Sequence, residues 1–278
     1  MNDEVIITPN KGLFDLQLNR VLRYKNLMYM LVKRDFITYY KQTILGPMWY
    51  VISPVLSTIM YIIVFGNLAG IGTDSIPQPL FYFSGTMLWT FFSNNLLKSS
   101  NTFIQNKDLF GKVYFPRIIV PISNVIGNLM KLTIQFVLFV IVFIYYIVVG
   151  VIHYSGFKIL LFVPCIAWIA IVAVGLGMII SSVTTKYRDL AMALEFIISL
   201  LMYATPVVYP ISEVSGKLRV VLCLNPVSAP IEVFRYAFFG ESSIPVWSIV
   251  YSIIMSIVIL FVGIIAFNQN EQTFIDVI

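Results

Sequence analysis

Six long runs of apolar residues dominate the pattern of hydrophobic and polar positions along the chain. They cover residues 45–68, 79–97, 118–149, 157–183, 190–209 and 245–268. A hydrocarbon core of about 30 Å requires about 20 apolar residues in helical form. The pattern therefore predicts an all-α polytopic membrane protein with six transmembrane helices. The third run exceeds one simple span, and we expect its start to lie in the interface.

This pattern divides the chain into three regions. Residues 1–44 precede the first run, residues 45–268 form the transmembrane domain, and residues 269–278 form a tail. Between the fifth and sixth runs the chain is about half polar, with two short apolar pieces at residues 220–224 and 231–239. We expect these pieces to form short re-entrant or interfacial helices.

Residues 11–43 have the spacing of an amphipathic helix. Apolar residues recur every three or four positions on one face, whereas Arg34, Thr38 and Lys41 fall on the opposite face. The apolar residues are Met28, Val32, Phe36 and Tyr39. Such a helix can lie in the headgroup plane with its apolar face down. The alternative is a cytoplasmic helix that packs against its own protein.

The composition supports a membrane protein. Hydrophobic residues make up 59% of the chain and charged residues only 11%, whereas a soluble domain has roughly 25% charged residues. The net charge of +5 is modest and no dense cluster of Lys and Arg exists. These features favour a basic cytoplasmic face in contact with membrane lipids and disfavour a nucleic-acid partner.

Most of the 18 basic residues fall on one side of the predicted spans. They are Lys11, Arg20, Arg23, Lys25, Lys33, Arg34 and Lys41 before the first run, Lys98, Lys107, Lys112 and Arg117 in the second loop, and Lys186 and Arg188 in the fourth. Cytoplasmic loops carry the excess of Lys and Arg. The pattern therefore predicts that both termini are cytoplasmic.

Polar residues recur at helical spacing inside three of the runs. The first run contains Tyr50, Ser53, Ser57 and Tyr61, the third Asn124, Asn128, Lys131 and Gln135, and the fifth Glu195, Ser199, Tyr203 and Pro206. Polar groups in the membrane face protein or water rather than lipid. These stripes indicate either a polar path or helix–helix contacts made by small and polar residues. We expect Lys131 to pair with Glu195, since an opposite charge would offset much of the desolvation cost.

Enzyme chemistry has little support in the sequence. No GxSxG, HExxH or zinc-ligand pattern occurs. The two cysteines, Cys165 and Cys223, are far apart and His153 is the one histidine. We expect no catalytic residue, no metal site and no cofactor in this chain.

Short motifs follow one another in a fixed order over most of the chain. They are Arg34-Asp35, Tyr40-Lys41-Gln42-Thr43, Leu45-Gly46, Trp49, Pro54, Phe83-Ser84-Gly85, Trp89-Thr90, Phe91-Phe92-Ser93, Lys112 to Arg117, Pro121, Tyr187-Arg188-Asp189, Thr205 to Pro210, Asn225-Pro226, Glu232 and Arg235. In these motifs the chain resembles the permease subunit of ABC-2 exporters, in particular those that export lipid-linked polysaccharide such as O-antigen. One departure is Tyr39, where many relatives carry Arg.

The resemblance implies a homodimer in the bacterial inner membrane with six spans per protomer. It also implies two copies of a separate ABC subunit that binds ATP and Mg²⁺, and a polyprenyl-diphosphate-linked glycan as substrate. ABC-2 permeases for teichoic acid, capsule, lipid or drug remain alternatives, and an intramembrane acyltransferase is a more distant one.

Three groups of residues are candidates for these roles. Aromatic rings can stack on sugar faces without fixing them, so the candidates for the substrate path are Tyr50, Ser53, Ser57, Tyr61, Ser199 and Tyr203. The candidates for binding the diphosphate at the entrance are Arg34 and Lys41, because phosphate needs cationic partners. The candidates for docking the ATP-binding subunit are Asn106, Lys107, Asp108, Leu109 and Phe110. We expect the path to open between two protomers, and Pro54 and Pro206 to interrupt the first and fifth helices.

Overall fold

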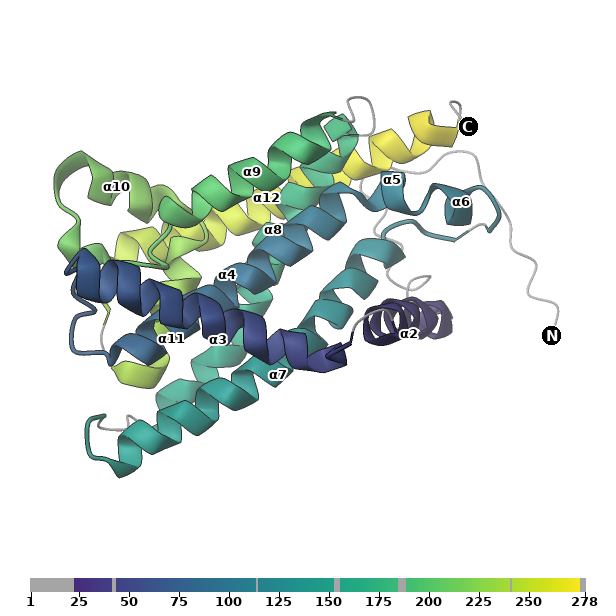
Figure 1. The fold of residues 1–278 in the computed structure, drawn as a ribbon. Coiled ribbons are helices and arrows are strands. Elements are labelled where there is room, and N and C mark those ends of the chain that lie inside the picture. Colours follow the sequence, from purple (N-terminus) through teal and green to yellow (C-terminus); the bar gives the residue numbers. More distant parts are fainter. Residues whose placement is uncertain are drawn as a thin grey trace.

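The computed structural model describes residues 23–41, 44–113, 115–152, 156–184, 189–240 and 242–275, and these are helical apart from turns and an isolated bridge between Thr73 and Ser75. The long helices are α3 (Trp49–Tyr61), α4 (Gln78–Ser100), α7 (Ile119–Val148), α8 (Phe162–Thr184), α9 (Asp189–Tyr203) and α12 (Val246–Ile275). They lie side by side as an elongated bundle (Figure 1). Several motif and terminal positions lie outside the described residues: residues 1–22, Gln42, Thr43, Tyr114, His153, residues 185–188, and residues 276–278.

Four helical stretches in the described part of the chain are long and apolar enough to cross a membrane. They are Gly46–Leu68, Ile119–Val148, Gly156–Thr184 and Val246–Gln269. Each coincides with one of the predicted runs. The first joins a 3-10 turn (Gly46–Met48), α3 and a π-helical stretch (Ile62–Leu68). Helices also form at the second and fifth predicted runs, as α4 and α9. Helix α9 is shorter, at 15 residues, and α4 contains more polar residues than the four stretches above.

Helix α4 lies at the centre of the bundle and is less apolar than the other long helices. It packs against α3, α7 and α8, and nearly all of its side chains between Leu80 and Leu96 are buried. A helix that faces protein instead of lipid can carry polar residues, which explains Ser84, Asn94 and Asn95 within it. On its far side, α8 approaches α12 closely at two glycines: a Cβ atom on Gly263 would lie 2.5 Å from the carbonyl oxygen of Gly175.

The two prolines predicted to interrupt helices, Pro54 and Pro206, differ in their effect. Helix α9 ends at Tyr203, six residues before the predicted end of the fifth run, and a turn leads into Pro206. Proline disfavours the helical conformation at the preceding residue, so the helix stops there. Pro54, in contrast, lies inside α3. The predicted interruption at Pro54 was therefore wrong, because the helix passes through this proline.

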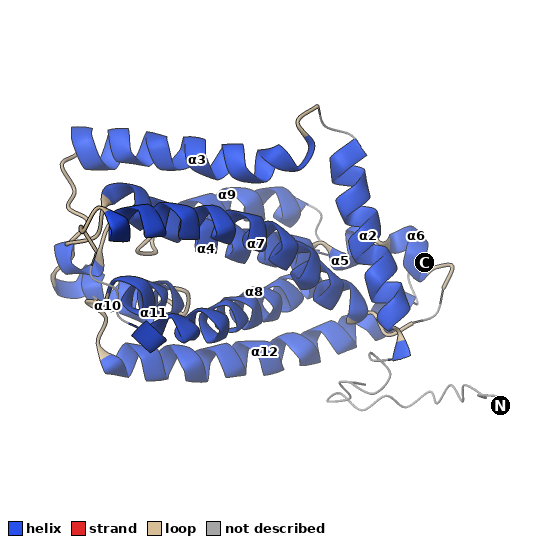
Figure 2. Cartoon of the chain, turned by 90° about the horizontal axis from the view of Figure 1, so that it is seen from below, coloured by secondary structure: helices blue, strands red, loops and turns tan. Residues whose placement is uncertain are grey.

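The two ends of the bundle carry different short elements. Helices α10 (Gly216–Leu224) and α11 (Ser228–Phe239) lie at one end, so the two short apolar pieces are helical as predicted. Helices α2 (Lys25–Lys41), α5 (Thr102–Gln105) and α6 (Lys107–Phe110) lie at the other. Figure 2 shows α2 crossing that end at a steep angle to the bundle, with α3 along one side.

Helix α2 packs against its own protein along one face. Its residues Leu27, Met28 and Leu31 form a small apolar cluster with Phe115 and Ile119 at the start of α7. On the opposite side Tyr29 and Met30 are more than half exposed. This arrangement agrees with the alternative of a helix packed on its own protein, and its relation to the headgroup plane stays a prediction.

Candidate functional site

A polar cavity of about 280 Å³ lies between α3, α4 and α7. We call it the inner cavity. It is lined by Trp49, Tyr50, Ser53, Pro54, Ser57, Tyr61, Thr86, Trp89, Thr90, Phe91, Asn94, Asn128, Lys131, Leu132, Gln135 and Met202. Aromatic rings, hydroxyls and amides thus share one space, and Lys131 is the charged group in this lining.

Four of the six predicted path residues meet in the inner cavity. They are Tyr50, Ser53, Ser57 and Tyr61, and all four come from the same face of α3. The hydroxyl of Tyr61 donates to the sulfur of Met202 at 3.5 Å, which ties α3 to α9. The other two residues are on α9, where both are exposed and neither lines the cavity. These are Ser199, which donates to the Glu195 carbonyl, and Tyr203.

Amide side chains of α7 lie on the side of the inner cavity opposite α3. Asn128 donates from Nδ2 to Oδ1 of Asn95 at 2.9 Å, and Asn95 donates in turn to the carbonyl of Phe91. Gln135 donates to the carbonyl of Tyr50 at 3.2 Å and so links α7 to α3. Within the described part of the chain, Oδ1 of Asn128 accepts no hydrogen bond. The lining of the cavity therefore includes a residue with a buried, unsatisfied acceptor.

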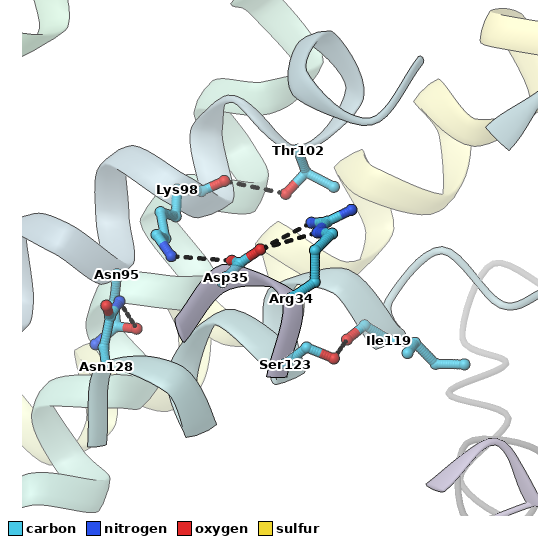
Figure 3. Close-up of polar contacts among 8 residues, drawn as sticks. All are labelled: Arg34, Asp35, Asn95, Lys98, Thr102, Ile119, Ser123 and Asn128. Carbon is cyan, nitrogen blue, oxygen red and sulfur yellow. Dashed lines mark hydrogen bonds and ion pairs between the residues drawn. The ribbon is translucent and has the colours of Figure 1, made fainter. Parts of the chain in front are cut away.

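A second cavity of about 430 Å³ lies at the α2 end of the bundle. We call it the entrance cavity. Its charged lining residues are Arg34, Asp35, Lys98 and Lys131. Asp35 accepts from Arg34 at 2.9 Å and from Lys98 at 3.2 Å, so one carboxylate bridges α2 and α4 (Figure 3). Three cations against one carboxylate make this cavity a candidate site for an anion.

The two cavities share Tyr50 and Lys131, which line both of them. The ammonium group of Lys131 lies 5.2 Å from the centre of the Tyr50 ring, a cation–π distance. Glu195 is exposed on α9 and lines neither cavity. Its pairing with Lys131 stays a prediction.

One of the two residues predicted to bind the diphosphate lines the entrance cavity, and two charged residues of its lining were not predicted. Arg34 lines the entrance cavity, whereas Lys41 is exposed in the last turn of α2 and is not part of the lining. Asp35 and Lys98 were missed as site residues. A signal for Lys98 was present in the sequence, since Asn94 and Lys98 are four residues apart and so share one face of a helix.

The docking candidates divide into buried and exposed residues. Asn106 is buried and donates to the carbonyl of Thr102, while the half-buried Phe110 lies 5.6 Å from Phe115, ring centre to ring centre. Lys107 and Asp108 are exposed on α6. Lys107 and Asp108 are therefore more accessible here than the half-buried apolar pair Leu109 and Phe110.

A buried ion pair at the α10–α11 end is a further feature without a role assigned from the sequence. Arg235 donates to Glu232 at 2.9 Å, and both side chains are almost fully buried. Arg235 also donates to the carbonyls of Pro206, Val207 and Phe81. It thereby joins α11 to the segment after α9 and to α4.

Comparison with known proteins places the chain in a transporter family. Residues 26–239 match the family described as "ABC-2 type transporter". The chain is similar to the O-antigen export system permease protein RfbA of Myxococcus xanthus, at 24% identity over 93% of this chain and 98% of the relative. The protein of that name from Klebsiella pneumoniae is 26% identical, over 91% and 95%. The capsule polysaccharide export inner-membrane protein CtrC of Neisseria meningitidis is 23% identical, over 88% and 91%. This chain is an integral membrane protein that belongs to the ABC-2 type transporter family.

Proposed function

We propose that this chain is the permease subunit of an exporter that moves polyprenyl-diphosphate-linked polysaccharide across the bacterial inner membrane. The observation that supports it most directly is the pair of adjoining cavities. The entrance cavity carries cations suited to a phosphate, and the inner cavity carries aromatic rings, hydroxyls and amides suited to a sugar. The names of the similar permeases, for O-antigen and for capsule polysaccharide, support the same class of substrate.

The proposal includes six spans, with α4 and α9 as the second and fifth. Helix α4 has 23 residues and is therefore about 35 Å long, enough to cross the hydrocarbon core. Helix α9 has 15 residues, about 23 Å, and turns follow it up to Tyr209. With the basic residues inside, both termini and the α2, α5 and α6 end are cytoplasmic, and α10 and α11 cover the outer end.

The path for the glycan opens between two protomers of a homodimer in this proposal. Helices α3 and α9 both present large exposed apolar side chains, including Leu56 and Met60 on α3 and Phe196 and Leu200 on α9. Exposed apolar surfaces of this kind contact either lipid or a second copy. The protomer's own inner cavity is small, so a chain of many sugars requires the second protomer to complete the path.

The energy source in this proposal is a separate ABC subunit, present in two copies, which binds ATP and Mg²⁺. The chain itself is a transport permease without a catalytic role, a metal or a cofactor. The exposed residues Lys107 and Asp108 on α6 are the best candidates for contacts with that subunit. Charged rim residues of this kind set orientation and association rate more than affinity.

The test is reconstitution of this chain with the ABC subunit that forms a complex with it. Inverted vesicles that contain both proteins should take up a polyprenyl-diphosphate-linked glycan only when ATP is supplied. A variant of the ATP-binding subunit that cannot hydrolyse ATP is the control. ATP hydrolysis stimulated by a lipid or a drug, without movement of any glycan, would contradict the proposal and favour another ABC-2 substrate. Transport restricted to a teichoic acid or a capsule glycan would narrow the substrate.

A further inference from the structure

We propose that the inner cavity is a subsite within each protomer for the first sugar of a glycosyl phosphate. The sugar ring lies against Asn94, Asn128 and Trp89, and its phosphate lies at the Lys131 end. This inference rests on the proposed function and deepens it, because it adds a recognition step that precedes entry into the path between protomers.

The size of the inner cavity limits its ligand to a single small group. Its volume is about 280 Å³, whereas pockets for drug-sized ligands measure roughly 300–1,000 Å³. One sugar ring fits such a space and an oligosaccharide does not. The cavity therefore selects one unit of the glycan rather than accommodating the chain.

Asn128 provides the strongest sign that the inner cavity binds a polar ligand. Its side chain is 2% exposed, and Oδ1 accepts no hydrogen bond among the described residues. A buried polar atom without a partner costs roughly 1–3 kcal/mol of stability. Its Nδ2 is fixed by Asn95, which orients the amide and leaves Oδ1 as the unpaired atom. A hydroxyl donor from a ligand would satisfy this acceptor.

The arrangement of charge in the inner cavity defines the chemical class of the ligand. Most of the lining is neutral and combines the indole rings of Trp49 and Trp89 with amides and hydroxyls. Such a surface suits a neutral polyhydroxylated ring with weakly apolar faces. The charged group Lys131 lies at the boundary that the cavity shares with the entrance cavity. A ring with many hydroxyls and one anionic end matches this pattern.

The entrance cavity extends the same ligand toward α2. The cations of Arg34 and Lys98 line it together with Lys131. A phosphate held by Lys131 would therefore stand between a sugar in the inner cavity and a further phosphate among these cations. The sugar attached to the diphosphate, rather than a distant sugar of the glycan, is the unit that can reach the inner cavity.

The experiment compares two lipids on the purified permease with its ATP-binding subunit. One probe is an isoprenyl diphosphate without sugar, and the other is the same lipid with one N-acetylhexosamine. Binding is measured by the shift in thermal unfolding over a range of lipid concentrations. The wild type should bind the sugar-bearing lipid about five- to tenfold more tightly, which corresponds to one or two hydrogen bonds.

The decisive variant is Asn128→Leu, which keeps the branched shape of the side chain and removes its polar atoms. It should reduce the affinity ratio of the two lipids to about one, with affinity for the bare lipid retained. The unfolding temperature of the ligand-free protein should be unchanged or lower, because the variant also removes the donor to the buried Oδ1 of Asn95. Thr58→Val is the matched control, because Thr58 Oγ1 is also buried without a partner but lies outside the cavity lining. Asn94→Leu, at a half-buried position on α4, tests the same ratio if the first variant fails to fold.

The outcomes separate this inference from the proposed function. Equal affinities for the two lipids in the wild type, or an unchanged ratio in both asparagine variants, would overturn the subsite. If the same preparation exports glycan, the proposed function stands without it. Failure of the wild type to bind either lipid or to export glycan would overturn both.

Discussion

Two arginine–carboxylate pairs at opposite ends of the bundle show how burial changes the role of the same chemical groups. In the first, Arg235 and Glu232 have side chains only 1% and 5% exposed. In the second, Arg34 and Asp35 are 53% and 32% exposed. The donor–acceptor distance is 2.9 Å in both pairs. Distance alone therefore does not distinguish a structural ion pair from a binding site.

The buried pair is fixed by additional contacts. Arg235 donates to three backbone carbonyls and its guanidinium carbon lies 3.7 Å from the centre of the Phe81 ring. A buried charge is stable only when further hydrogen bonds replace its lost hydration. These contacts come from α4, from the segment after α9 and from α11, so the pair holds three parts of the fold together.

The exposed pair is open to exchange. Asp35 is shared between Arg34 and Lys98, and all three side chains line the entrance cavity. Exposed ion pairs contribute about 0–1 kcal/mol, because water and salt compete with them. A phosphate can therefore replace the Asp35 carboxylate at small cost. The comparison favours a structural role for the α11 pair and supports the α2 pair as the proposed ligand site.

The largest expected effect comes from breaking the buried pair. Arg235→Leu should lower the free energy of unfolding by about 3–5 kcal/mol, because it leaves the Glu232 carboxylate buried without its cation. Thermal unfolding in detergent measures this effect. The double variant Arg235→Leu with Glu232→Leu is the control and should recover much of the loss. A single variant that unfolds at the wild-type temperature would contradict the structural role.

A smaller effect is expected from Gly85, which lies beside the same pair. A Cβ atom at this position would lie 2.7 Å from the Val207 carbonyl oxygen and 3.0 Å from Nη2 of Arg235. Gly85→Ala should therefore destabilise the protein by about 1–3 kcal/mol through overpacking. Gly127→Ala on α7 is the control, since nothing lies within 4 Å of its added Cβ. Equal unfolding temperatures for the two variants would show that the contacts around Arg235 can relax.

The smallest effect on stability is expected at the entrance. Lys98→Gln should change the free energy of unfolding by less than about 1 kcal/mol. It should nevertheless raise the lipid concentration that gives half-maximal stimulation of ATP hydrolysis about tenfold, because a charged hydrogen bond to phosphate is worth roughly 1.5–3 kcal/mol. Asp35→Asn is the matched variant, because it removes the carboxylate that competes with the phosphate. It should leave the lipid concentration for half-maximal stimulation unchanged or lower it. An increase in both variants would mean that Asp35 positions the cations rather than competing with the ligand.

The comparison also shows why the sequence could indicate one site more readily than the other. Arg34 stands on the polar face of an amphipathic pattern, which the sequence displays directly. Glu232 and Arg235 are three residues apart within a largely apolar piece, and the sequence does not state which backbone carbonyls they meet. Those carbonyls belong to Phe81, Pro206 and Val207, which are distant along the chain.

By itself the sequence determined where most of the helices form and one wall of the candidate site. Long apolar runs have few alternatives to helices, because backbone groups in a membrane must be satisfied within the segment. Helical periodicity placed Tyr50, Ser53, Ser57 and Tyr61 on a single face of the first predicted helix, and in the structure these four residues line one cavity.

Only the tertiary structure decided what faces that wall. The stripe containing Asn128 and Lys131 was visible in the sequence, but its position opposite α3 depends on how α7 and α4 pack together. The burial of α4 and the unpaired Oδ1 of Asn128 likewise arise from contacts between distant segments. Periodicity describes the face of one helix, whereas a cavity is defined by several helices whose relative rotation is set by side-chain packing.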